Sequence, residues 1–151
     1  MSKCYSSGTA PSQAGTGPLT ACTILSTALI RSMVNEIIGG ISTTPADQTY
    51  QLCATRCTTA GTAASNPTAL PLDPSDVPAI SIVGITHSAE PTYTAASDLL
   101  DIYLNQRATF RWVAQDGREL VGPATANNGI GARMKLASAS STLHVTVLFR
   151  E

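Results

Sequence analysis

Residues 143–150, LHVTVLFR, decide the fold class that the sequence indicates. Every second residue of this stretch is apolar, while His144, Thr146 and Arg150 lie among the alternate positions. A repeat of two places successive side chains on opposite sides of a β-strand. The stretch therefore predicts a terminal strand with one markedly apolar face, formed by Leu143, Val145, Val147 and Phe149.

Shorter stretches upstream share this period and predict further strands at residues 80–85, 100–105, 109–114, 119–121 and 130–136. The second is ambiguous, because Ser97 before Leu99-Leu100 is also compatible with the cap of a short helix. Asp116-Gly117 is the favoured two-residue turn of a β-hairpin, and Asn128-Gly129 is a second turn signal. These features predict an antiparallel β-sandwich or jelly roll over residues 79–151.

The first half of the chain favours helices instead. Apolar residues recur every four positions between residues 23 and 38, as expected for one face of a helix, and Gly39-Gly40 supplies a stop signal. A second helix is expected over residues 43–58, because Thr44 precedes Pro45 at a first helical position and Asp47 lies near the positive helix end.

The remaining segments complete a prediction of one compact domain that is mainly β with some α. Residues 1–18 contain mostly Gly, Ser, Thr, Pro and Ala, and we expect an extended arm that is mobile alone or ordered on a neighbouring subunit. Residues 59–78 contain four prolines, which indicate an extended crossing segment. The predicted organisation is an arm at 1–18, a helical and proline-rich assembly region at 19–78 and the sandwich at 79–151.

The composition excludes several classes of function. Of 151 residues only 13% are charged, and the net charge of −1 does not provide the positive field that nucleic-acid binding requires. No uninterrupted apolar stretch reaches the roughly 18 residues of a membrane span. Residues 19–30 resemble the apolar part of a signal peptide, but only Lys3 precedes them as a charge, so we do not expect secretion. We predict neither a nucleic-acid partner nor a membrane partner.

No motif predicts catalysis, a metal or a cofactor. The four cysteines, Cys4, Cys22, Cys53 and Cys57, have no C-x-x-C spacing, and we expect free thiols, with a disulfide or a metal site as alternatives. The cluster of His87, Ser88 and Glu90 is better explained by a solvated loop than by acid–base chemistry. We therefore expect a protein that is not an enzyme.

Candidate contact residues come from the apolar pattern. The run Arg107–Trp112 combines cations with aromatic rings, but we interpret it as a packed strand whose Trp112 anchors the core or meets another subunit. The predicted subunit contacts are Tyr5, Leu25, Leu29, Met33, Ile37 and Trp112.

The last third of the chain resembles a known group of proteins. The stretch NQRATFRWVAQDGRELVGPATANNGIGARM at residues 105–134, followed by an alternating strand that ends in FRE, is similar to small virion structural proteins of tailed bacteriophages, including capsid cement or decoration proteins. The resemblance implies a β-sandwich on the capsid exterior, no enzyme activity, a homotrimer, and the major capsid protein as partner. It also implies assembly in the host cytoplasm, where reduced thiols are expected.

Two other functions are compatible with the sequence. A tail or baseplate structural component of a phage would share the same sequence features. A carbohydrate-binding sandwich belongs to a different class; such modules usually present surface aromatic rings, whereas only 5% of these residues are aromatic.

Overall fold

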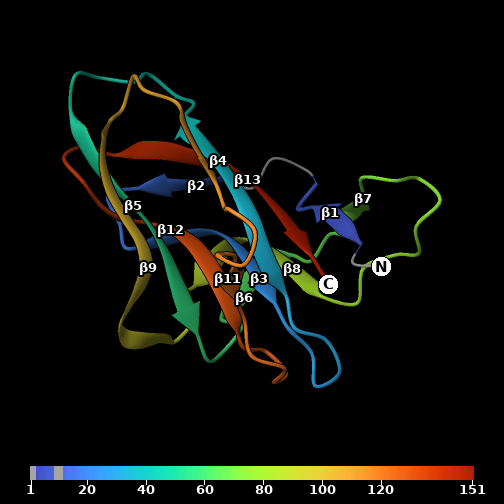
Figure 1. Cartoon of the computed structure of the whole chain (residues 1–151). Helices are drawn as coiled ribbons and strands as arrows, with labels where there is room; N and C mark the ends of the chain where they lie inside the picture. The colour runs from blue at the N-terminus through green and yellow to red at the C-terminus, as the bar shows by residue number, and fades with distance from the viewer. Residues whose placement is uncertain (1–2, 9–11) are drawn as a thin grey trace.

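The computed structural model describes residues 3–8 and 12–151 and places them in two antiparallel β-sheets packed as a sandwich (Figure 1). The first sheet has the strand order β10 (Phe110–Val113), β4 (Met33–Ile41), β13 (Ser141–Arg150), β1 (Cys4–Ser6) and β7 (Leu70–Pro71). In addition, β11 (Leu120–Val121) pairs with β4 and β2 (Ser12–Gly15) pairs with β13. The second sheet has the order β6 (Thr62–Ser65), β8 (Ile82–Ala89), β3 (Leu19–Leu25), β12 (Gly129–Ala137), β5 (Thr49–Cys57) and β9 (Tyr93–Asn105).

The strands expected in the second half are confirmed, with longer bounds in most cases. Residues 100–105 belong to β9, so the strand interpretation is correct there and the short helix is not. In β13 every second side chain is buried, because this strand lies in the middle of its sheet with one face on the core. Leu143, Val145, Val147 and Phe149 are each at most 2% exposed.

The two expected helices are wrong, because the described residues contain no helix. Residues 23–38 include the end of β3, a loop and most of β4, while residues 43–58 include a loop and β5. The fold is therefore all β within the described chain, not mainly β with α. Residues 19–78 are no separate helical region either, since β3, β5 and β6 lie in one sheet and β4 and β7 in the other.

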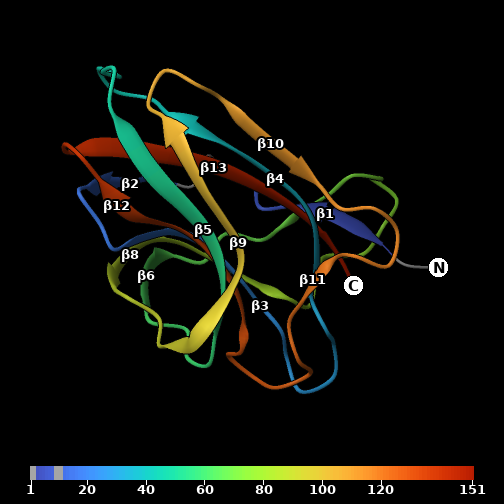
Figure 2. The ribbon, with the colours of Figure 1, turned by 60° about the vertical axis from the view of Figure 1, so that its left-hand side comes forward.

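The expected hairpin at Asp116-Gly117 is a turn without a hairpin. The backbone N–H of Arg118 donates to the Gln115 carbonyl at 2.9 Å, and Gly117 has a φ of +80°. However, the strands on either side, β10 and β11, pair with successive parts of β4 and not with each other. They behave as one interrupted edge strand, seen along β4 in Figure 2.

Much of the expected N-terminal arm is part of the first sheet. β1 pairs with β13 and β7, and β2 pairs with β13 further along. The Tyr5 ring is fully buried and stacks on Phe149, with ring centroids 5.6 Å apart. Residues 1–2 and 9–11 of the expected arm lie outside the described residues.

Eight strands form a frame around the core, counting β10 and β11 as one: β1, β3, β4, β5, β9, β10/β11, β12 and β13. Numbered one to eight in chain order, they run 6-3-8-1 in the first sheet and 2-7-4-5 in the second. The chain thus passes between the sheets at nearly every step, and β6, β7 and β8 form an insertion between the fourth and fifth frame strands. The core between the sheets contains, among others, Tyr5, Ile24, Val34, Ile37, Leu52, Met134 and Phe149.

Candidate functional site

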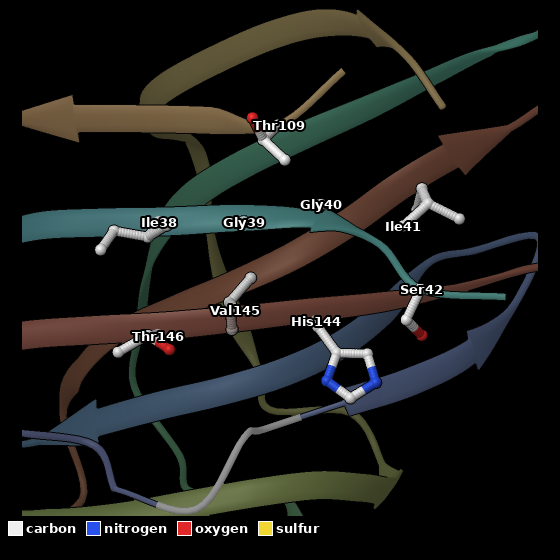
Figure 3. Close-up of a pocket in the computed structure, with 9 residues that line it drawn as sticks. All are labelled: Ile38, Gly39, Gly40, Ile41, Ser42, Thr109, His144, Val145 and Thr146. Atoms are coloured by element: carbon white, nitrogen blue, oxygen red, sulfur yellow. The ribbon is translucent and has the colours of Figure 1, made fainter. Parts of the chain in front are cut away.

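A shallow apolar hollow lies on the first sheet, at the end of β4. Its volume is about 290 Å³. Figure 3 shows its lining on three neighbouring segments: the end of β4, the facing stretch of β13 and the residue before β10. The lining residues are Ile38, Gly39, Gly40, Ile41, Ser42, Thr109, His144, Val145 and Thr146.

Gly40 keeps this hollow open. It pairs with His144 in the sheet, and in Figure 3 it lies between Thr109 and His144. A Cβ at this position would have the Thr109 Cγ2 atom as its nearest neighbour, at 3.6 Å. That is an ordinary contact distance, so the space is free and no backbone constraint demands glycine. The missing side chain therefore leaves a recess bordered by apolar groups and hydroxyls.

The second sheet carries a polar cluster that spans β5, β9 and β12. Asp98 accepts hydrogen bonds from Lys135 Nζ at 2.7 Å and from Thr55 Oγ1 at 2.5 Å. Burial opposes ionisation of this carboxyl group, but the hydrogen bonds from Lys135 and Thr55 outweigh burial and lower its pKa. Asp98 is therefore held as a carboxylate in a structural ion pair.

A second polar group ties the loop after β8 to β3. The backbone N–H of Thr20 donates to Glu90 Oε1 at 2.8 Å, and the Thr20 hydroxyl donates to the other carboxylate oxygen of Glu90. Since the single hydroxyl proton of Thr20 is used in this way, the Tyr93 hydroxyl donates to Thr20 Oγ1. Burial raises the pKa of Tyr93, so the phenol keeps its proton. The Arg133 guanidinium lies over the Tyr93 ring, 3.9 Å from its centroid.

Cys53, Asp98 and Asp101 are the only described residues whose side chains gather as a metal site would require, with ligand atoms within 4.8 Å of one another. Their surroundings do not favour a cation, because Lys135 already pairs with Asp98 and Arg133 lies 3.8 Å from it. Burial and the neighbouring Asp101 raise the pKa of Cys53 to about 12, whereas a metal ligand must be a thiolate. These residues fit a hydrogen-bonded cluster better than a metal centre.

The cysteines do not form an activated nucleophile. All four are free thiols, as expected, and three of them are buried. Burial raises the pKa of Cys22 to about 12 and that of Cys57 to about 11. Reactive cysteines need a lowered pKa and access to solvent, so Cys22 and Cys57 are packing groups.

Several exposed apolar side chains lie close together in sequence, in a stretch that we call the proline segment, residues 70–80. Its prolines are at positions 71, 74 and 78, and it starts with β7 at the end of the first sheet. Its four large apolar side chains, Leu70, Leu72, Val77 and Ile80, are between 51% and 58% exposed. Clustered exposed apolar groups indicate an interaction surface more strongly than single ones do.

The structure distributes the six predicted contact residues over several environments. Tyr5, Leu25 and Ile37 are at most 1% exposed and are buried within the chain itself. Met33 and Trp112 are half-buried. Trp112 packs against the core, which is one of the two alternatives that the sequence left open for it. Leu29 alone is strongly exposed, at 86%, on the loop between β3 and β4.

Sequence reasoning missed both surface features. The sequence pattern indicates Gly39-Gly40 as the stop signal of a helix. In the structure these two glycines lie in β4 and line the hollow. Most of the proline segment falls in the predicted crossing segment at residues 59–78, while Ile80 is predicted to begin a strand, and neither prediction singles out the exposed apolar side chains.

Comparisons with protein-family models, curated proteins and solved structures give no match to this chain. Among the described residues no helix is long and apolar enough to span a membrane.

Proposed function

We propose that this chain is a non-enzymatic virion structural protein of the capsid cement or decoration type, which stabilises a phage head by bridging major capsid subunits. The observation that carries the proposal is the order of the eight frame strands, 6-3-8-1 and 2-7-4-5. This order corresponds to a jelly roll, an architecture that recurs in viral capsid proteins, lectins and cupins.

The surface chemistry supports a shell protein among these alternatives. Only 13% of the residues are charged, so close contact between many copies and a shell meets little charge repulsion. The proline segment adds exposed apolar area, whose burial contributes about 25 cal/mol per Å². The resemblance of residues 105–134 to phage virion proteins points to the same class.

The carbohydrate-binding alternative has less support. Sugar sites usually stack the ring on an aromatic side chain, and the lining of the hollow includes no Phe, Tyr or Trp. A cupin-like metal site would need several histidines together. Both histidines of the chain, His87 and His144, have other surroundings: His87 is buried on β8 and hydrogen-bonded to Thr20 of β3, and His144 lines the hollow.

The proposed mechanism is adhesion across seams. Copies of the sandwich lie over junctions between major capsid subunits on the outside of the head. Each contact is modest, but symmetric repetition gives an avidity far above the affinity of one interface. A trimer bound in this way resists the outward pressure of packaged DNA without contacting the DNA.

Reconstitution on shells tests the proposal. Shells of the major capsid protein from the virus that encodes this chain are purified without it, and the chain is added back at increasing concentration. We expect saturable binding, detected by co-sedimentation, and a higher temperature of DNA release from filled heads. No binding to shells, together with binding of a labelled copy to tails, would transfer the protein to the tail class and overturn the proposal.

A further inference from the structure

We propose that copies of this chain join head to tail, with the proline segment of one copy docked in the hollow at the end of β4 of the next. This deepens the proposed function, on which it rests only for the expectation of three copies.

The proline segment is exposed, yet firmly attached to the sandwich. The Tyr5 hydroxyl donates to the Val77 carbonyl at 3.1 Å, and the backbone N–H of Leu72 donates to the Cys4 carbonyl at 2.9 Å. At its end the N–H of Ile80 donates to Glu151 Oε1 at 2.7 Å. The prolines further restrict the backbone. A segment held in this way presents its apolar side chains without a large entropy cost on binding.

The hollow has the size and chemistry to receive such side chains. A cavity of about 150 Å³ holds a benzene molecule in another protein, so about 290 Å³ is enough for an apolar side chain with its neighbour. Its nine lining residues include apolar groups, hydroxyls and His144, but no carboxylate. It therefore does not repel the two acidic residues of the proline segment, Asp73 and Asp76.

Charge makes contact between two proline segments less favourable than contact with the hollow. No Lys or Arg occurs from residue 57 to residue 106, so nothing in the segment neutralises Asp73 and Asp76. Two segments packed against each other would bring four carboxylates together, and like charges oppose association. Arg107, an exposed cation, lies two residues before Thr109, which lines the hollow.

The two surfaces lie toward opposite ends of the first sheet. The proline segment begins at β7, beyond β1, whereas the hollow lies over β4 and β13 next to β10 (Figures 1 and 3). A contact between different surfaces leaves each copy with one free segment and one free hollow until the chain of copies closes into a ring. A homotrimer is the closed form that we expect.

Three single variants test the interface. Leu72→Asp charges the segment, and Gly40→Val fills the hollow. The matched control is Leu136→Asp, since Leu136 is 56% exposed and Leu72 is 55% exposed, but Leu136 lies on the other sheet. By light scattering on purified protein, we expect a trimer for the original chain and for Leu136→Asp, and monomers for the other two. Circular dichroism and thermal unfolding identify any variant that fails to fold.

A mixing experiment distinguishes head-to-tail contact from contact between like surfaces. The Leu72→Asp copy retains its hollow and the Gly40→Val copy retains its segment, so an equimolar mixture should form a heterodimer with a single interface. Contact between two segments predicts that the Gly40→Val copy pairs only with itself, and contact between two hollows predicts the same for the Leu72→Asp copy, so neither predicts a complex of the two variants. A monomeric original chain, or a mixture that stays monomeric, overturns the inference.

Shell binding separates this inference from the proposed function. If the two variants are monomers that still saturate shells, the contact between copies is not needed for capsid attachment, and both the interface and the proposed function are supported. If the original chain is a monomer that binds shells, the interface is wrong while the proposed function survives. If it forms the trimer but does not bind shells, the proposed function fails and the interface survives.

Discussion

His87 is the residue through which acid is expected to weaken the fold. This residue is only 2% exposed. Its Nδ1–H donates to the Thr20 carbonyl at 3.3 Å, and its Nε2 accepts from the Thr23 hydroxyl at 3.4 Å. Burial lowers its pKa, despite the opposing effect of the Thr20 carbonyl. Below the usual value of about 6.5, the unfolded chain therefore binds the proton and the folded chain does not, so the free energy of unfolding decreases as the pH is lowered.

The prediction is a difference between two proteins at two pH values. Urea unfolding of the original chain should give a lower free energy at about pH 5 than at about pH 7, and His87→Gln should reduce this loss because glutamine does not titrate in this window. The comparison within each protein removes the cost of the substitution itself. An equal loss in both proteins would show that other groups cause the acid sensitivity.

At the scale of elements, the sequence predicts strands well where the period is unambiguous and fails where it is not. From Leu143 to Phe149 every second residue is apolar, and these residues are the buried ones in β13. Leu25, Leu29, Met33 and Ile37 recur every four residues, which suits one face of a helix but is also a multiple of two. The β-branched residues around them, as in TACTIL at 20–25, are the local signal that favours strands.

The candidate surfaces needed information that no local pattern contains. The hollow exists because β13 and the residue before β10, about 100 and 70 residues further along the chain, lie beside Gly40. The hairpin at Asp116-Gly117 failed for the same reason: the turn is local and correct, but the pairing of β10 and β11 with β4 is not local. Contacts of high sequence separation set the sheet order, and a single sequence does not specify them.

The first strand supplies the prediction at this scale. β1 is only three residues long, but it carries Tyr5 into the core against Phe149. Tyr5→Ala should therefore lower the free energy of unfolding by about 3–5 kcal/mol, as expected for the loss of a buried aromatic side chain. Tyr5→Phe keeps the ring and loses only the hydrogen bond to Val77, which costs about 1 kcal/mol.

Tyr103 is the matched control for this measurement, because its ring is 64% exposed and removal should change stability by no more than about 0.5 kcal/mol. Urea unfolding measures all three variants. If Tyr5→Ala unfolds like Tyr103→Ala, β1 is a dispensable arm and not part of the sandwich.

At the scale of the whole molecule, low charge and clustered apolar exposure determine how copies should meet. A net charge of −1 gives no long-range attraction between copies, and the proposed contact buries apolar side chains of the proline segment in a hollow without carboxylates. Such a contact depends on the hydrophobic effect, which is strengthened by salts that are excluded from the protein surface, such as sulfate. It does not depend on ion pairs, which added salt weakens by screening.

The dependence of self-association on salt therefore discriminates between these two kinds of contact. Raising NaCl from about 0.1 M to about 1 M shortens the Debye length from about 10 Å to about 3 Å, which weakens contacts made by exposed ion pairs. We expect the Kd of the copies, measured by analytical ultracentrifugation, to stay constant or fall, and ammonium sulfate to lower it further. Asp76→Asn is the control, because it removes one carboxylate from the segment and should leave this trend intact. A tenfold rise in Kd, about 1.4 kcal/mol, would mean that charged groups such as Arg107 hold the copies together and that the apolar segment does not.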